Sequence, residues 1–254
     1  MNYRIADING LPFIVGKYRD DPFTVIPPFY LDGFSSYELF GEIKARLGVD
    51  SLRICPLVSD EVSKIKDHFS DAEISLSRDL ADYFYSTSDL INLSGKKFHQ
   101  KRNHVNSFVS KYSYTYVQVS ASDPESLKLL KSACDTLYDE NSGQDFADEH
   151  TAISEMIENF EVLGLAAGVI LCDGKPVAYS IGEHMSDDTA LIHFEKADKN
   201  FSGSFAAINK MFAGREFADT LFINREEDMG IEGLRKAKLS YHPVRLGEYY
   251  TAII

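Results

Sequence analysis

The chain has 254 residues, and its 39 acidic against 26 basic side chains give a formal charge of −13 at pH 7. Hydrophobic residues make up 44% and charged residues 26%, a globular composition that excludes a disordered chain, a collagen, a coiled coil and a disulfide miniprotein. The acidity argues against general coating of nucleic acid and against binding to an anionic membrane, so we expect no DNA partner.

Targeting and redox features are sparse. Residues 1–7 lack the apolar core of a signal peptide, and no stretch approaches the roughly 20 apolar residues of a membrane span. The three cysteines, Cys55, Cys134 and Cys172, do not have metal-ligand spacing. We therefore expect a cytoplasmic protein with small buried cysteines, no metal site and no tightly bound cofactor.

Short apolar runs separated by turn residues occupy the first part of the chain. Strands are expected over residues 11–15, 23–30 and 51–58. Between them, Ser35 and Glu38 form a capping-box pattern that opens a helix ending at Gly48. A short helix with one apolar face is expected over residues 60–69.

The composition changes at Ser94. Residues 94–104 form a dense basic run that continues at helical spacing, and a period-two strand follows over residues 112–119. Asp123, followed by Pro124, is expected to cap the next helix. A further helix ends at Gly164.

The last part of the chain gives the clearest pattern. A hairpin is expected around the turn Asp173-Gly174, followed by strand, helix, strand, helix and a final extended segment. The first of these helices is expected to turn Phe205, Ile208 and Phe212 inward. Strand–helix–strand alternation implies a parallel pair inside a mixed sheet.

Cationic side chains gather at the start of the basic helix. Lys96, Lys97, Lys101 and Arg102 would suit a phosphate or carboxylate ligand, and they stand out in an acidic protein. The alternative is a solvated helix face.

A second dense segment lies at the end of an expected strand. His193 and Glu195 are expected on one face and Phe194 and Lys196 on the other. Open α/β sheets bind ligands beyond the carboxyl ends of their strands, which favours a site here. The alternative is a surface ion pair worth about 0–1 kcal/mol.

A third segment leads from a strand into a helix. Asn224, Arg225, Glu226, Glu227 and Asp228 follow each other there. The carboxylates alone are weak evidence for Mg²⁺, and they would also complement the helix dipole. Arg225 is better placed as a structural or substrate clamp.

The fourth segment is the end of that helix. Lys238 is one of several lysines that suit a helix C-terminus, and Tyr241 and His242 follow where a phenol or imidazole could act as an acid. The alternative is helix capping with a packed tyrosine. Motifs of P-loop enzymes, zinc proteases, paired CxxC sites and serine hydrolases are missing.

Together, these segments resemble a known family. The resemblance rests on residues 94–103, 159–165, 192–197, 223–230 and 233–241, and it covers about residues 23–253. The family is grouped with the C-terminal domain of phosphatidylglycerol lysyltransferases. The resemblance implies an α+β fold of two acetyltransferase-like (GNAT) domains in tandem, with mixed sheets flanked by helices, as in Fem-type aminoacyltransferases. We expect the domains to be residues 1–110, ending in the basic helix, and residues 111–254.

The resemblance also implies transfer of an acyl or aminoacyl group to an amine or hydroxyl of a small-molecule or peptide acceptor. Acetyl-CoA-dependent members place a glycine-rich pyrophosphate loop before a helix, where this chain has a single glycine in residues 199–205. This departure favours aminoacyl-tRNA over acyl-CoA as co-substrate. The alternatives are an acyl-CoA-dependent N-acyltransferase and a non-catalytic binding module for an anionic metabolite or peptide.

The chemistry assigns a role to each candidate residue. A base must take the acceptor proton, and cations must face the developing oxyanion. Glu195 is expected as the base with Asp228 in reserve, Lys196 and Arg225 as clamps, and Tyr241 as the acid. The donor phosphates are assigned to Lys96, Lys97, Lys101, Arg102 and Lys238, and the substrate contacts to His193, Asn224 and Glu226.

Overall fold

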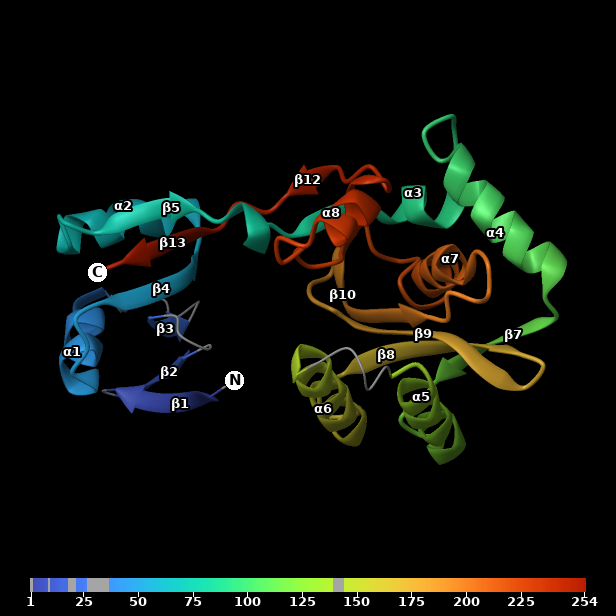
Figure 1. Cartoon of the computed structure of the whole chain (residues 1–254), viewed down its shortest axis with the longest axis horizontal. Coiled ribbons are helices and arrows are strands. Elements are labelled where there is room, and N and C mark those ends of the chain that lie inside the picture. Colours follow the sequence, from blue (N-terminus) through green and yellow to red (C-terminus); the bar gives the residue numbers. More distant parts are fainter. Residues whose placement is uncertain (1, 9, 18–21, 27–36, 139–143) are drawn as a thin grey trace. The chain divides into compact units, whose positions relative to one another are not determined.

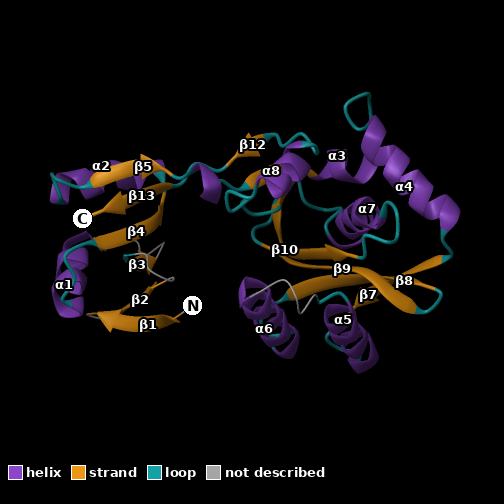
Figure 2. Cartoon of the chain, viewed as in Figure 1, coloured by secondary structure: helices purple, strands orange, loops and turns teal. Residues whose placement is uncertain are grey.

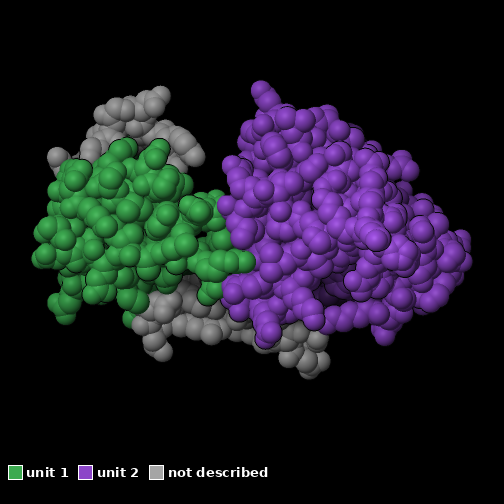
Figure 3. All heavy atoms as spheres, turned by 90° about the horizontal axis from the view of Figure 1, so that it is seen from above, with its two compact units in different colours: residues 1–81, 247–254 green, residues 82–246 purple. Residues whose placement is uncertain are grey.

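The computed structural model describes residues 2–8, 10–17, 22–26, 37–138 and 144–254. The chain forms two compact units, residues 1–81 with 247–254 and residues 82–246 (Figure 3). This division differs from the boundary expected near Lys111. Residues 83–111 fall in the second unit because Tyr83, Phe98 and Phe108 are buried in its core.

The first unit is built on a six-stranded sheet in the order β1-β2-β3-β4-β13-β5. Its strands are β1 (Asn2–Ile8), β2 (Leu11–Lys17), β3 (Phe23–Ile26), β4 (Leu52–Leu57), β5 (Glu73–Leu76) and β13 (Tyr250–Ile253). The helices are α1 (Tyr37–Leu47), α2 (Ser59–His68) and the 3₁₀ turn η1 (Arg78–Leu80). Phe13, Val25, Phe40, Ile54 and Ile65 are buried in its core.

Local signals predicted part of this unit. The strand at residues 51–58 and the helix at 60–69 are confirmed as β4 and α2. The strand expected over residues 23–30 is described as Phe23–Ile26, and Ser35 of the capping box lies outside the described residues. Strand β13, which joins this sheet between β4 and β5, comes from the other end of the chain and has no local signal for that position.

The second unit is built on a seven-stranded sheet in the order β12-β6-β11-β10-β9-β8-β7. Its strands are β6 (Tyr83–Ser86), β7 (Tyr114–Val119), β8 (Leu165–Cys172), β9 (Lys175–His184), β10 (Thr189–Ala197), β11 (Phe222–Asn224) and β12 (Arg245–Leu246). Strands β10 and β11 pair in parallel, and the other neighbours are antiparallel. The expected parallel pair inside a mixed sheet is therefore confirmed.

Helices cover both faces of this sheet. They are α3 (Thr87–Asn92), α4 (His99–Lys111), α5 (Pro124–Thr136), α6 (Gln144–Glu158), α7 (Ser204–Glu216) and α8 (Glu232–Leu239). Helices α4 and α7 lie on one face, while α5 and α6 lie on the other (Figures 1 and 2). Two buried clusters follow this division, one around Phe108 and Phe212 and the other around Leu130 and Ile153.

Two local predictions are confirmed in this unit. Asp173 and Gly174 both have positive φ at the β8–β9 turn, as a two-residue hairpin requires. The Asp123 side chain accepts a hydrogen bond from the Glu125 amide at the start of α5, and Pro124 occupies the first turn.

Strand β10 changes its facing part-way along. Its pairing with β9 is irregular between Ile192 and Phe194. Ile192 is buried on the α7 side, whereas Phe194 packs against the cluster on the α5–α6 side. Past this bulge Glu195 faces α7, where it meets Asn209. A bulge re-aims the side chains that follow it, and here it aims a carboxylate.

Strands β10 and β11 also part at this point. Their parallel pairing covers only Thr189–Leu191 and Phe222–Asn224, and β10 then runs on to Ala197. The residue that follows β11 is Arg225. Polar groups at the carboxyl ends of two parallel strands thus come together where the strands separate, which is a favourable place for a ligand in an α/β sheet.

In the described part of the chain, no helix combines the length and the apolar character needed to cross a bilayer.

Gly182 of β9 lies opposite the bulge, so a substitution at this position tests how tightly the two strands pack there. A Cβ atom there would come within 2.4 Å of the Leu191 carbonyl oxygen, whereas a Cβ at Gly233 of α8 would meet nothing within 4 Å. We expect Gly182→Ala to lower the free energy of unfolding by about 1–3 kcal/mol. The control Gly233→Ala should leave it unchanged or raise it by up to about 1 kcal/mol. Urea unfolding followed by circular dichroism checks both, and equal stability of the two variants would contradict this account.

Candidate functional site

An ion pair between Arg225 and Glu195 occupies the place where β10 and β11 part. Arg225 Nη2 lies 2.9 Å from Glu195 Oε1, and the two side chains are only 12% and 10% exposed. Asn209 of α7 donates to the second carboxylate oxygen at 3.0 Å. Desolvation of two charges is costly unless the geometry is good and further hydrogen bonds are made. The second unit therefore holds a nearly buried, oriented carboxylate.

Two polar atoms beside this pair have no hydrogen-bond partner among the described residues. They are Arg225 Nη1 and Asn209 Oδ1, and both are buried. A buried polar atom without a partner costs about 1–3 kcal/mol. The pair is thus flanked by an unused donor and an unused acceptor, a combination that a bound polar ligand would satisfy.

Aromatic rings and a second cation complete the surroundings. The Arg225 guanidinium lies 5.6 Å from the Tyr85 ring centre and 5.0 Å from that of Tyr241. Lys101 Nζ of α4 lies 3.8 Å from the Tyr241 ring centre. Burial, followed by the charge of Arg225, lowers the pKa of Lys101 to about 8. Burial also raises the pKa of Tyr85 and Tyr241, so both phenols are neutral donors.

The charge at this site is unbalanced. Two cations, Arg225 and Lys101, contact the Tyr241 ring, whereas the Glu195 carboxylate pairs with Arg225. A surplus of positive charge with an unused guanidinium donor suits a carbonyl oxygen that develops negative charge, or an anionic group.

Lys238 supports the loop that carries Arg225. Its ammonium donates to the carbonyl oxygens of Arg225, Glu226 and Glu227, and Tyr85 donates in turn to the Lys238 carbonyl at 2.9 Å. Burial, followed by the charge of Arg225, lowers the pKa of Lys238 to about 8. The structure therefore uses Lys238 to position the loop, whereas the sequence suggested a donor contact.

Asp228 is committed to the same loop. Its fully buried carboxylate accepts hydrogen bonds from Tyr83 at 2.5 Å, from Arg235 at 2.8 and 2.9 Å, and from the Gly230 amide at 3.0 Å. The hydrogen bonds from Arg235, more than those from Tyr83 and the Gly230 amide, hold the pKa of Asp228 well below its usual range. A carboxylate bound this way is a poor base, so Glu195 is the better candidate.

Lys196 lies on the other face of the sheet. It pairs with Glu149 of α6 at 2.7 Å, whereas its neighbour Glu195 contacts α7. The alternation of side chains along a strand places the two residues on opposite sides. The structure thus does not bring Lys196 and Arg225 together as the pair of clamps that the sequence suggested.

His193 belongs to a polar cluster beside the bulge. Its ring nitrogens lie 3.0 Å from Glu226 and 3.1 Å from Glu183. Burial acts against the charged ring, but the hydrogen bonds and charges of Glu226 and Glu183 outweigh it and raise the pKa of His193. Asn224 is buried, donates to Asp82 and accepts from the Glu226 amide. These contacts place Asn224 and Glu226 as supports of the loop.

The predicted phosphate-binding cations have different surroundings. Lys96 is exposed, Lys97 pairs with Asp89 at 2.9 Å, and Arg102 donates to the carbonyls of Leu93 and Gly95 in the turn before α4. Lys101 alone of these four lies beside Arg225. The four cations are close in the sequence, two before α4 and two in its first turn, but the structure does not gather them into one anion site.

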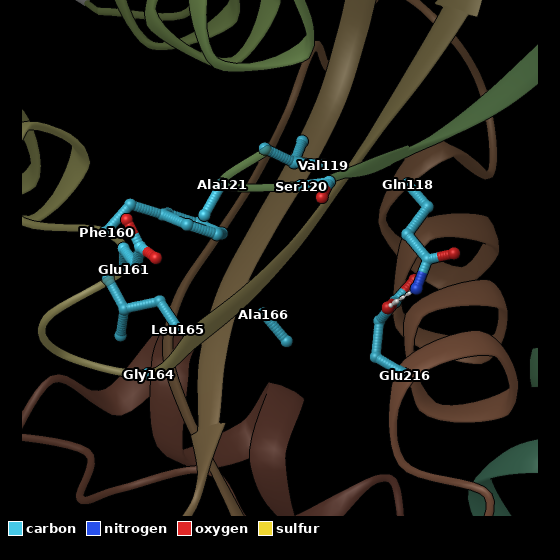
Figure 4. A pocket seen from close by; sticks show the side chains of 10 residues that line it. All are labelled: Gln118, Val119, Ser120, Ala121, Phe160, Glu161, Gly164, Leu165, Ala166 and Glu216. Carbon is cyan, nitrogen blue, oxygen red and sulfur yellow. Dashed lines mark hydrogen bonds between the residues drawn. The ribbon is translucent and has the colours of Figure 1, made fainter. Parts of the chain in front are cut away.

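A pocket of about 340 Å³ lies elsewhere in the second unit (Figure 4). It is lined by the end of β7 and the turn after it, the turn between α6 and β8, the start of β8 and the end of α7. Gln118 donates a hydrogen bond to Glu216 at 2.6 Å. Its charged lining residues, Glu161 and Glu216, are both acidic. None of the sequence-predicted site residues lines it, and its charge does not suit an oxyanion or a phosphate.

The sequence missed two neighbours of the ion pair. Neither Asn209 nor Tyr85 belongs to a motif. Phe205 was expected to face the core from α7, but it is 41% exposed, and Asn209 of the same helix is fully buried instead. A polar residue within the buried stripe of a helix was the available signal, because such a residue needs a partner.

Residues 56–253 match the family described as "Phosphatidylglycerol lysyltransferase, C-terminal". The chain belongs to this family. The expected resemblance is thereby confirmed, since it rested on motifs within the same range.

Individual relatives agree with this assignment. A solved structure of a conserved protein of unknown function from Bacteroides thetaiotaomicron is 32% identical, with a TM-score of 0.80 over 99% of this chain and 86% of that chain. An uncharacterized protein of Mycoplasmoides gallisepticum is 24% identical over 80% of this chain. The chain spans only 65% of that curated relative.

More distant structures share the fold. The C-terminal domain of a putative lysylphosphatidylglycerol synthetase from Agrobacterium fabrum has a TM-score of 0.69 at 13% identity, covering 99% of this chain and 83% of that chain. FemX and a tandem GNAT protein from the clavulanic acid pathway have TM-scores of 0.54 and 0.53, each at 10% identity, over 99% and 98% of this chain and 87% and 81% of theirs. The mixed α+β, GNAT-like fold is thus shown.

Asp228 provides a test of the loop. We expect Asp228→Asn to lower the free energy of unfolding by about 1.5–3 kcal/mol at pH 7, because it weakens charge-assisted hydrogen bonds. The pKa of Asp228 is lowered on folding, so its contribution is full above about pH 4 and is lost as the pH falls further. The difference from wild type should therefore shrink below about pH 4. Denaturant unfolding at several pH values measures it.

A matched control is Asp219→Asn. Asp219 is 75% exposed and pairs with His184, so its replacement should change stability by less than about 0.5 kcal/mol. A decrease in stability for Asp228→Asn no larger than for this control would contradict a supporting role for Asp228.

Proposed function

We propose that this protein transfers an aminoacyl group from aminoacyl-tRNA to an amine or hydroxyl of a small-molecule or peptide acceptor, on two GNAT-like domains in tandem. The family assignment and the fold shared with FemX and a tandem GNAT protein support the reaction class and the layout. The observation that carries the proposal is the nearly buried Glu195–Arg225 pair, with an unused guanidinium donor, where β10 and β11 part.

The residues around this pair fit the roles that the reaction requires. Glu195 accepts one hydrogen bond on each oxygen, and a carboxylate can accept about four, so it keeps capacity to take a proton from the acceptor. Arg225 Nη1 is a buried donor without a partner among the described residues, and the Lys101 ammonium contacts the same Tyr241 ring as the Arg225 guanidinium. We assign the stabilisation of the oxyanion of the tetrahedral intermediate to these two cations.

The step balances as an acyl transfer. The acceptor nitrogen or oxygen forms a bond to the acyl carbon while the bond from that carbon to the donor ribose oxygen breaks. Glu195 takes the acceptor proton, and Tyr241, a neutral phenol beside Lys101 and Arg225, supplies a proton to the leaving ribose oxygen. Tyr241 regains its proton from Glu195 or solvent, so no other reactant is needed.

The loop before α7 favours an aminoacyl-tRNA donor over acyl-CoA. A pyrophosphate cradle needs backbone amides that point at the ligand. Here the amides of Asn200 and Phe201 donate to Asp198, that of Ser202 donates to the Tyr112 hydroxyl, and that of Ser204 donates to the Phe201 carbonyl. These four amides therefore already have acceptors, within the loop or, for Ser202, at Tyr112. The carboxylate of Asp198 would also repel a pyrophosphate.

Substitution of the ion pair tests the catalytic roles. We expect Glu195→Gln and Arg225→Lys each to lower kcat/KM by at least about 100-fold, since one loses the base and the other the planar fork. Arg215→Ala, an exposed cation at the end of α7, should stay within a few-fold of wild type. Mass spectrometry of products from mixed aminoacyl-tRNA and pooled acceptors provides the assay, and circular dichroism verifies folding.

The same assay separates the alternatives. Full activity of folded Glu195→Gln and Arg225→Lys would refute this site. Thermal stabilisation by an amino acid, peptide or anionic metabolite, with no transferred product, would instead indicate a binding module. Transfer from acyl-CoA but not from aminoacyl-tRNA would overturn the donor assignment.

Salt dependence tests the donor. The exposed Lys96 and Lys97 are the candidates for phosphate contacts outside the Arg225 region. Their joint replacement by Ala should weaken tRNA binding and reduce the slope of log affinity against log salt by about 0.7–0.9 for each phosphate group that is no longer neutralised. The control is joint replacement of Lys131 and Lys175, also exposed, which should leave binding as it is. Filter binding at two salt concentrations measures this, and undetectable tRNA binding at low salt would remove the donor.

A further inference from the structure

A second group of chemically active side chains lies on the opposite face of the same sheet. Cys134 and Asp135 come from the last turn of α5, and His150 comes from α6. One ligand atom from each, the thiol sulfur, a carboxylate oxygen and a ring nitrogen, lies within 4.8 Å of the others. His150 Nε2 and Asp135 Oδ1 are 3.0 Å apart.

The burial of these groups is graded. Cys134 is 2% exposed, whereas the side chains of His150 and Asp135 are 29% and 57% exposed. The sulfur therefore lies at the base of the cluster, and the nitrogen and the carboxylate lie towards solvent.

The chemistry of this donor set is specific. Zinc binds thiolate sulfur at about 2.3 Å and imidazole nitrogen or carboxylate oxygen at about 2.0–2.2 Å, with tetrahedral geometry. These lengths place ligand atoms on one ion roughly 3.3–3.8 Å apart. Since the three atoms lie within 4.8 Å of one another, the longest separation would have to shorten by at most about 1.0–1.5 Å to reach that spacing. A mixed sulfur, nitrogen and oxygen set excludes Mg²⁺ and Ca²⁺, which prefer oxygen alone.

We propose that Cys134, Asp135 and His150 bind a zinc ion, with the fourth position taken by water or another ligand. Such an ion would join the end of α5 to α6. The surroundings are suited to hold the ligands, because the Tyr179 hydroxyl of β9 is hydrogen-bonded to Cys134 and the Tyr138 ring packs 4.5 Å from the His150 ring. Partners of this kind orient metal ligands.

Nothing in the sequence marks this site. The three cysteines lack metal spacing, and we expected no metal ligands. The three residues come together because α5 and α6 pack against each other through the buried cluster of Leu130, Ile153 and Ile157. Sequence spacing alone does not reveal this packing. The site also lies apart from the proposed transfer site and does not depend on it.

Cobalt substitution tests the proposal in the full chain stripped of metal. Titration with Co²⁺ should give a thiolate-to-cobalt charge-transfer absorption and visible bands of a tetrahedral ion, and Zn²⁺ should displace them. Cys134→Ser should abolish the charge-transfer absorption. Asp135→Asn and His150→Ala should each weaken Zn²⁺ binding by at least about 100-fold, since loss of outer-shell partners alone costs 10–100-fold.

Matched controls exist for both ligand types. Cys172→Ser removes another buried free cysteine, and His184→Ala removes a histidine that also pairs with an aspartate, Asp219, at 3.3 Å. Both should bind cobalt as wild type does. Zn²⁺ should raise the Tm of the wild type and of these two controls, but not the Tm of Asp135→Asn. Because the Asp135 side chain is exposed, its replacement should not impair folding, so a missing Tm increase would reflect lost zinc binding.

Two results would overturn the proposal. One is a wild-type protein that binds neither Co²⁺ nor Zn²⁺, in which case the cluster is a His–Asp ion pair above a buried thiol. The other is cobalt absorption that persists in Cys134→Ser and is abolished in Cys172→Ser.

Discussion

The geometry of the candidate site in the second unit depends on the ion pair between Arg225 and Glu195. Each charge loses most of its hydration, and a buried charge that loses its partner costs about 3–5 kcal/mol. Both groups must therefore be held in place by rigid elements. Glu195 is fixed by the bulge in β10 and by Asn209 of α7, while Arg225 follows directly on β11, whose pairing with β10 ends one residue earlier.

Most of the charged residues around Arg225 serve to hold its loop. The ammonium of Lys238 binds three successive carbonyls, and Asp228 ties the following turn to Tyr83 and Arg235. Glu226 and Met229 adopt positive φ, which costs energy for residues with a side chain and persists only where neighbours enforce it. A segment rich in acidic and basic residues thus acts mainly as a frame for one guanidinium.

The sequence predicted what short-range signals determine. The Asp173-Gly174 turn, the Asp123 cap and the alternation of strands and helices after residue 165 each follow from neighbours in the chain, and the structure has them. The placement of β13, the facing of Lys196 and the partner of Lys101 depend on contacts between distant segments. A single bulge after Ile192 reverses the side of the sheet to which every later residue of β10 points, and no local sequence pattern predicts this bulge.

Adjacent positions on β10 connect the two faces of the sheet. Glu195 belongs to the Arg225 site, and Lys196 pairs with Glu149, the neighbour of His150 on α6. A metal ion bound at α5 and α6 would therefore act on β10 mainly through that ion pair. The side chains of the Lys196–Glu149 pair are 29% and 25% exposed, against 12% and 10% for the Arg225–Glu195 pair, so solvent screens the former more strongly. Since the buried Glu195–Arg225 pair is held by stronger constraints, the ion would stabilise the α5–α6 face and leave the geometry of the opposite site nearly unchanged.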